Sequence, residues 1–217
     1  MITNASDRTV AVSFSPRIWL APLLLMLLLL ATECGGEVVR LALRFDRSAI
    51  EAGQWWRLLS GNFVHLGWYH WMLNEIGIAV LVMLCPESLS IAVLARRVLV
   101  IGAGMALCLY RFVPSLQTYV GMSGVIHGLF VLGLLPQVLK RDLISLGCLV
   151  FLLGKLGYEQ FAGAPISDEA AIGGSVITDS HFYGALTAFA YAVVFRVWDQ
   201  PERLIPRFAG KKPAPGE

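Results

Sequence analysis

Six mostly apolar stretches run along the chain, separated by polar or mixed segments. A helix that crosses a bilayer needs about 20 mostly apolar residues, with a working range of about 17–25. Each stretch is close to that length, so we predict six membrane-spanning helices. They lie at residues 17–33, 68–84, 94–112, 119–138, 143–160 and 180–195. The pattern therefore predicts an all-α membrane protein built as a bundle of six transmembrane helices.

The first stretch, WLAPLLLMLLLLAT, has the apolar run of a secretory signal peptide, and Cys34 lies where a lipoprotein signal carries its cysteine. Glu33, directly before Cys34, disrupts the small-residue cleavage site that such a signal needs. Because further apolar stretches follow, we expect an uncleaved signal anchor.

A long external loop, residues 35–67, follows the first predicted helix and exceeds the usual length of such connections. The letters VVRLALRFDR space three arginines along one helical face, and two tryptophans follow; these residues are Arg40, Arg44, Arg47, Trp55 and Trp56. Such a segment suits the membrane interface, with its apolar face in lipid and its aromatic rings at headgroup level. The alternative is a loop that lies in water.

Lys and Arg predict the orientation, because both are enriched in cytoplasmic loops. Six spans place both ends of the chain on one side, and most of the 17 Lys and Arg residues lie there. The opposite side holds the long loop and the acidic Asp168 and Glu169. We therefore expect cytoplasmic termini, a membrane domain at residues 1–198 and a short cytoplasmic tail at residues 199–217.

The composition excludes several classes of protein. Of the 217 residues, 57% are hydrophobic and 15% are charged, whereas soluble domains average about 45–50% and 25%. This excludes an ordinary soluble protein and a disordered chain. The net charge is +2 without a basic stripe, so we expect no nucleic-acid partner. The four cysteines are scattered singly, without a zinc-ligand spacing, and we expect no metal and no cofactor.

Polar side chains near the external ends of the predicted helices are candidate functional residues, because polar groups within a membrane are costly. In HLGWYHWMLN, which also holds His65, the residues His70 and Asn74 lie four apart and share a helical face. Both can donate hydrogen bonds, and paired donors can bind a developing oxyanion. The alternative is that they hydrogen-bond neighbouring helices.

Ser123 is the candidate nucleophile. Gly121 and Gly124 flank it in GMSG, near the start of the fourth predicted helix, and leave its hydroxyl accessible. Unpaired amide groups at a helix N-terminus can stabilise negative charge there. Close packing of small residues between helices is the alternative explanation of this motif.

A serine nucleophile needs a base, and two histidines are candidates. His181 lies at the external start of the last predicted helix, and His127 lies four residues after Ser123 on the same face. Spacing alone does not choose between them. A base should approach the hydroxyl from across a cavity, whereas His127 points one turn deeper into the membrane. This geometry favours His181.

Lys155 and Glu159 lie four residues apart within the fifth predicted helix. Charges there are costly unless they are paired or face a cavity. One interpretation is a mutual ion pair near the interface, and the other is that Glu159 helps to recognise an extended substrate.

The motifs WRLLSGNFVHLGWYHWMLN and GMSG and the late histidine, in this order, resemble the rhomboid family of intramembrane serine proteases. The resemblance covers most of the chain. It implies a catalytic dyad of Ser123 and His181 without a third, acidic residue. It also implies that His70 and Asn74, together with the Ser123 amide, bind the oxyanion.

The same resemblance assigns supporting roles. His65 would be mainly structural, and Arg57 would belong to the tryptophan–arginine pair of the first external loop. Gly184 would pack the sixth helix closely on the fourth. His127 stands where many rhomboids carry a tyrosine that packs on the catalytic histidine.

Within the family, GMSGVIHG, KLGYEQF and the short chain are most similar to the rhombosortase branch. That branch is associated with removing a C-terminal sorting tail, which has a Gly-Gly motif, a hydrophobic helix and basic residues, from exported bacterial proteins. The resemblance implies a multi-pass protein of the bacterial inner membrane, in contact with lipid, whose active site opens to the periplasm. Water or another amine would resolve the acyl-enzyme.

Three other functions are consistent with parts of the pattern: a rhomboid protease that cleaves other transmembrane substrates, an inactive rhomboid that binds membrane helices, and a small transporter with histidine proton relays. The complete set of Ser123, His181, His70 and Asn74 favours a protease. Three of the four histidines cluster at one predicted external depth, whereas a transport path would scatter them.

Overall fold

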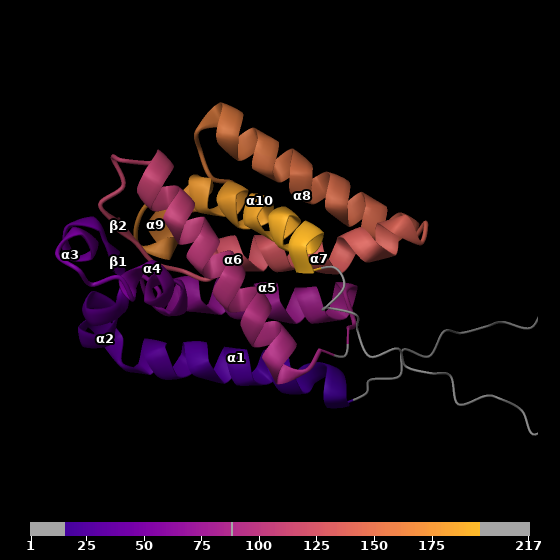
Figure 1. Ribbon diagram of the computed structural model, residues 1–217, viewed down its shortest axis with the longest axis horizontal. Coiled ribbons are helices and arrows are strands. Elements are labelled where there is room, and N and C mark those ends of the chain that lie inside the picture. Colours follow the sequence, from indigo (N-terminus) through magenta and orange to yellow (C-terminus); the bar gives the residue numbers. More distant parts are fainter. Residues whose placement is uncertain (1–15, 88, 196–217) are drawn as a thin grey trace, which may run out of the picture.

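The computed structural model describes residues 16–87 and 89–195, and long helices make up most of this part of the chain (Figure 1). The long helices are α1 (Pro16–Cys34), α5 (Trp68–Leu84), α6 (Ile91–Phe112), α7 (Ser123–Leu139), α8 (Leu143–Ala162) and α10 (Thr178–Phe195). Three of them, α1, α6 and α8, have the length and apolar composition of a membrane-spanning helix, and α5 and α7 are shorter apolar helices. The predicted class, a helical membrane protein, is confirmed. The predicted tail at residues 199–217 and the domain end at 198 lie outside the described residues.

Helix α7 begins later than predicted. Residues 118–119 form the short strand β2 (Thr118–Tyr119), and α7 starts only at Ser123. Gly121 has a φ of +121°, a conformation that glycine adopts readily and other residues rarely do. The turn at Gly121 therefore separates the strand from the helix and makes Ser123 the first helical residue.

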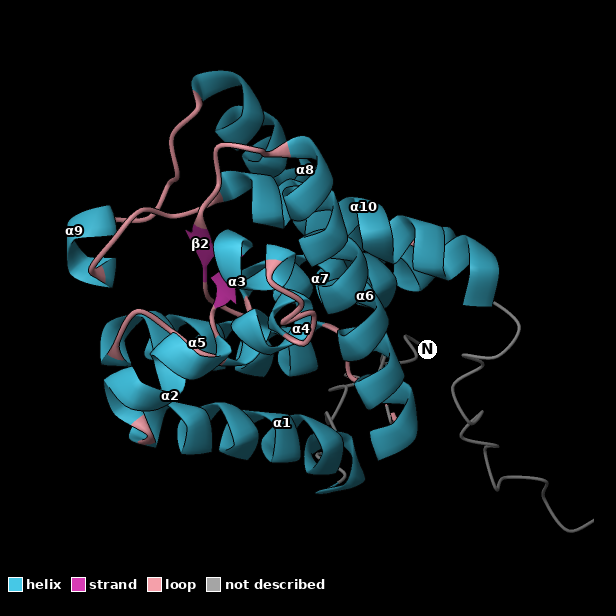
Figure 2. Cartoon of the chain, turned by 60° about the vertical axis from the view of Figure 1, so that its left-hand side comes forward, coloured by secondary structure: helices cyan, strands magenta, loops and turns pink. Residues whose placement is uncertain are grey.

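The long loop folds into short elements. These are α2 (Gly36–Leu43), β1 (Phe45–Asp46), α3 (Arg47–Glu51), α4 (Arg57–Ser60) and η1 (Gly61–Phe63). Strand β1 pairs antiparallel with β2, so that Phe45 lies opposite Tyr119. Figures 1 and 2 place both strands, α3 and the short helix α9 (Glu169–Ile172) at one end of the bundle.

The predicted common helical face of three arginines is wrong. Helix α2 ends at Leu43, and Arg44 is extended, with a ψ of 148°. Arg47 begins the next helix and donates hydrogen bonds to the carbonyl oxygens of Tyr110 at 3.0 Å and Val113 at 2.9 Å. The last carbonyl groups of a helix lack partners within it, so this guanidinium caps the C-terminal end of α6 and joins the loop to the bundle.

Helix α7 lies among four others, α5, α6, α8 and α10. The backbones of α7 and α10 approach each other closely, because both helices carry glycine where they meet. A Cβ atom on Gly184 would overlap the carbonyl group of Gly124, and one on Gly128 would lie 2.7 Å from the Gly184 carbonyl oxygen. Ala188, which is fully buried, continues this row of small residues.

We expect Gly184→Ala to lower the free energy of unfolding by about 1–3 kcal/mol, the usual cost of overpacking. The added methyl group would push α10 away from the backbone of α7. The midpoint of thermal unfolding in detergent measures the effect. Gly154→Ala in α8 is the matched control, because an added Cβ meets no atom within 4 Å there and alanine is the better helix former. Equal destabilisation by both substitutions would contradict this account of the contact.

Candidate active site

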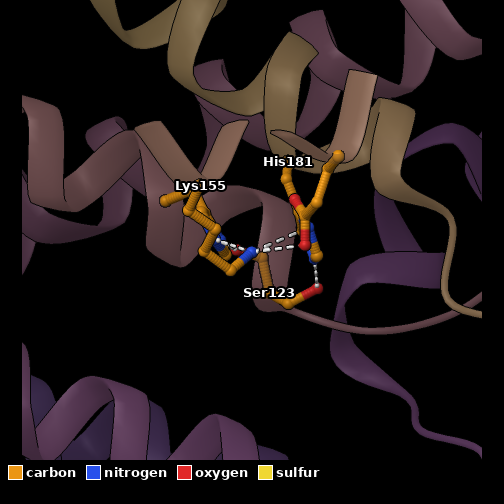
Figure 3. Close-up of polar contacts among 5 residues, drawn as sticks. Ser123, Lys155 and His181 are labelled. Carbon is orange, nitrogen blue, oxygen red and sulfur yellow. Dashed lines mark hydrogen bonds and ion pairs between the residues drawn. The ribbon is translucent and has the colours of Figure 1, made fainter. Parts of the chain in front are cut away.

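Ser123 and His181 meet between α7 and α10 (Figure 3). The Ser123 hydroxyl lies 3.0 Å from His181 Nε2. His181 is 3% exposed, whereas Ser123 is half-buried. Because α10 approaches α7 so closely at Gly184 and Gly124, residues 58 positions apart in the chain reach hydrogen-bond distance.

The turn before Ser123 is held by hydrogen bonds and requires glycine. The Gly121 amide donates to the Gly61 carbonyl at 3.0 Å, and the Tyr119 hydroxyl donates to the Gly121 carbonyl at 2.7 Å. A Cβ atom on Gly121 would lie 2.8 Å from His70 Nε2. Gly121 therefore serves both the left-handed turn and the close approach of the His70 ring.

His127 does not take the place of His181 at the hydroxyl. Its Nδ1 lies 2.7 Å from the Ser123 carbonyl oxygen, which can only accept, so Nδ1 donates there. Its ring stacks on the ring of His181, with centroids 4.2 Å apart and an interplanar angle of 15°. Of the two candidate bases, His181 is the one whose nitrogen faces the serine hydroxyl.

A carboxylate lies behind His181. Glu159 Oε2 is 2.8 Å from His181 Nδ1, and Glu159 Oε1 accepts a hydrogen bond of 2.6 Å from Lys155 Nζ. The resemblance implies a dyad without a third, acidic residue, and the structure places a carboxylate beside His181. The interpretation of Glu159 as a substrate-contacting residue is wrong, because its side chain is 0% exposed, whereas the expected ion pair with Lys155 is present.

The sequence did not reveal this contact between Glu159 and His181, because it joins two helices. The i,i+4 spacing of Lys155 and Glu159 indicated only that these two side chains could pair. Two charged residues on one face of an otherwise apolar helix were the available signal that this face is turned inward, toward a polar site.

The predicted oxyanion donors lie on α5. His70 is 9% exposed and Asn74 is 3% exposed. The Leu66 amide donates to His70 Nδ1 at 3.3 Å, so the neutral ring carries its proton on Nε2, the nitrogen beside Gly121. Asn74 Nδ2 donates to the His70 carbonyl at 2.8 Å, which fixes the amide and leaves its second hydrogen available.

His65 supports the His70 ring. It is 1% exposed, and the two rings pack edge to face with centroids 5.2 Å apart. Burial and, to a smaller extent, the neighbouring His70 lower the pKa of His65 to about 3. His65 is therefore neutral at physiological pH and packs against His70 as an uncharged aromatic ring.

Arg57 holds together the segment between α1 and α5. Its Nη1 donates to the carbonyl oxygens of Leu41 at 3.0 Å and Arg44 at 2.9 Å, and its Nε donates to the Gln54 side chain at 2.7 Å. These contacts connect the end of α2 with the start of α4. Trp56, which precedes Arg57 in the chain, is 56% exposed.

The arrangement combines a serine at the start of a helix with an imidazole within hydrogen-bond distance, a pairing that can activate a nucleophile. Within residues 16–87 and 89–195, no group of three or more His, Cys, Asp or Glu side chains is placed to hold a metal ion. The chemistry that these side chains can carry is attack by the Ser123 oxygen with His181 as base.

Two comparisons with known proteins bear on this site. The family model of the Rhomboid domain matches residues 52–198, a segment that begins between α3 and α4 and contains every long helix except α1. A search of curated proteins finds no match to the chain.

We expect Ser123 to react with a fluorophosphonate probe, since the imidazole can accept its proton. His181→Ala should slow labelling by about 10²–10⁴-fold, the usual contribution of a positioned base. His127→Phe should retain most of the labelling, because a phenyl ring can still stack on His181. Labelling followed over time in detergent gives the rates, and loss of labelling in His127→Phe but not in His181→Ala would reverse the assignment of the base.

Proposed function

Since the chain belongs to the rhomboid family, we propose that it is an intramembrane serine protease in which Ser123 is the nucleophile and His181 the general base. The observation that carries this proposal is the 3.0 Å contact between the Ser123 hydroxyl and His181 Nε2. The contact lies at the first residue of α7, where unpaired amide groups favour a negative charge.

The reaction would follow the acyl-enzyme route. The Ser123 oxygen attacks the carbonyl carbon of the scissile peptide bond while His181 Nε2 takes the hydroxyl proton. The tetrahedral intermediate collapses, the C–N bond breaks, and the imidazolium gives its proton to the leaving amine. Water, or another amine, then attacks the acyl-enzyme, and its proton passes through His181 back to Ser123.

The developing oxyanion would be bound from two sides. The Ser123 amide lies at the N-terminus of α7, where the N–H group has no acceptor within the helix and could donate to the oxyanion. His70 Nε2–H and the free hydrogen of the Asn74 amide would donate from α5. The closeness of the His70 ring to Gly121, two residues before the nucleophile, supports this role.

We infer that all six long helices cross the bilayer and that the active site opens to the external side. A short turn joins the N-terminal end of α7 to strand β2, which pairs with β1 of the long loop, so the nucleophile and this loop lie at one end of the bundle. Trp55 and Trp56 in that loop are 58% and 56% exposed, as suits the headgroup region. With cytoplasmic termini in a bacterial inner membrane, this end faces the periplasm.

As substrate we propose the C-terminal Gly-Gly sorting tail of an exported protein. The support is the resemblance of GMSGVIHG and KLGYEQF to the rhombosortase branch. The second motif contains Lys155 and Glu159, which lie in contact with His127 and His181. A Gly-Gly segment lets an extended backbone approach a nucleophile closely, because it carries no side chains.

We expect the protein in liposomes to cleave a reporter that ends in a Gly-Gly motif, a hydrophobic helix and basic residues, and Ser123→Ala to abolish this cleavage. The matched substrate carries Val-Val in place of Gly-Gly and should remain intact. Gel mobility and mass spectrometry of the released fragment give the rate and the scissile bond. Cleavage by Ser123→Ala would refute the mechanism, and equal cleavage of both substrates would indicate a rhomboid protease without sorting-tail specificity.

Asn74→Ala should lower kcat by about 10²–10³-fold, the usual effect of losing one oxyanion donor. An interaction made only in the transition state lowers kcat and kcat/KM equally. Steady-state cleavage of the same reporter tests this, with the unfolding midpoint as the check on the fold. A raised KM with unchanged kcat would instead place Asn74 in ground-state binding.

A further inference from the structure

The carboxylate behind His181 is enclosed by the protein. Glu159 is 1% exposed, and its two oxygens have different partners, since Oε2 lies 2.8 Å from His181 Nδ1 and Oε1 lies 2.6 Å from Lys155 Nζ. An isolated buried carboxylate would be strongly destabilising, whereas a paired one with both oxygens hydrogen-bonded is tolerated. Lys155 therefore favours the charged form of Glu159.

The contact determines which nitrogen of His181 carries the proton. A carboxylate only accepts, so Nδ1–H donates to Glu159, and the lone pair of Nε2 faces the Ser123 hydroxyl. In the other tautomer, Nδ1 would accept from Lys155, which lies 3.4 Å away, and Nε2–H would point at the serine. That tautomer cannot take the serine proton, and the shorter distance to the carboxylate favours the productive one.

His127 and Lys155 complete a closed chain of hydrogen bonds. Lys155 Nζ lies 3.0 Å from His127 Nε2, and His127 Nδ1–H donates to the Ser123 carbonyl. The chain thus runs from the Ser123 carbonyl through His127, Lys155, Glu159 and His181 to the Ser123 hydroxyl. Each link of this chain pairs one donor with one acceptor, with a single consistent set of tautomers. Figure 3 shows Ser123 and Lys155 both pointing toward His181.

We propose that Glu159 is a positioning residue that completes a Ser123–His181–Glu159 triad, and that Lys155 holds its carboxylate in place. This inference rests on the proposed protease function. Glu159 fixes the tautomer and the orientation of His181 and stabilises the imidazolium that forms during attack, the role that the acidic member has in serine protease triads. Lys155 keeps the carboxylate charged and also holds the His127 ring against His181.

We expect Glu159→Gln to lower kcat for the sorting-tail reporter by up to about 10⁴-fold, the loss seen when the acid of a triad becomes an amide, with KM changed less than about threefold. Glu159→Asp, which keeps the charge, should recover a large part of kcat. Glu51→Gln, in an exposed part of the loop, is the matched control and should behave as the unsubstituted protein. A rise in KM with unchanged kcat would overturn the proposal.

The double variant Lys155→Met/Glu159→Gln tests whether Glu159 positions His181 or only neutralises the charge of Lys155. It removes both charges together and so leaves no unpaired buried ion, which makes folding a smaller concern than in Glu159→Gln alone. We expect it to unfold at a midpoint near that of the unsubstituted protein and to remain slow in kcat. If it recovers the full kcat, Glu159 merely neutralises Lys155, and the proposal is overturned.

The outcomes also distinguish this proposal from the proposed function. If Ser123→Ala and His181→Ala lose cleavage while Glu159→Gln and the double variant cleave at the full rate, the protease function holds and the triad does not. If Ser123→Ala retains cleavage, the protease mechanism itself is wrong. Slow cleavage by Glu159→Gln with recovery in Glu159→Asp supports both.

Discussion

The approach of α10 to α7 at their glycines is the contact on which the candidate site depends. Gly184 lies against the backbone of Gly124. Gly124 directly follows Ser123, and Gly184 comes three residues after His181. The backbones that carry Ser123 and His181 are held a fixed distance apart by this contact. The packing of the two helices therefore sets the distance between the hydroxyl and the imidazole. A site built on two helices in this way is held more rigidly than one built on loops.

The turn that precedes Ser123 is fixed by the long segment between α1 and α5. Strand β2 pairs with β1, the Gly121 amide is bound to Gly61, and Arg47 connects the loop to the end of α6. This segment therefore determines where α7 begins.

The sequence predicted the helices better than it predicted the contacts between distant residues. The predicted span at residues 68–84 coincides with α5, since apolar length alone defines it. The start of the fourth span was wrong, because hydrophobicity does not register the positive φ of Gly121. The sequence offered Ser123 from a local motif and His181 from the family resemblance, whereas the link between Glu159 and His181 depends on how α8 is rotated against α10. The spacing of residues within one helix does not determine that rotation.

The charges of the proposed triad suit a site that lies within a membrane. Before attack, Lys155 and Glu159 form a neutral pair, and Ser123 and His181 carry no charge. After attack, the imidazolium and the oxyanion add one charge of each sign, so the site as a whole stays neutral. In a low-dielectric setting the separation of these two new charges is the dominant electrostatic cost. The carboxylate at Nδ1 reduces that cost on the histidine side, and the N-terminus of α7 with its donors reduces it on the oxyanion side. The lysine is thus the counter-ion that allows a carboxylate to be present before the reaction begins.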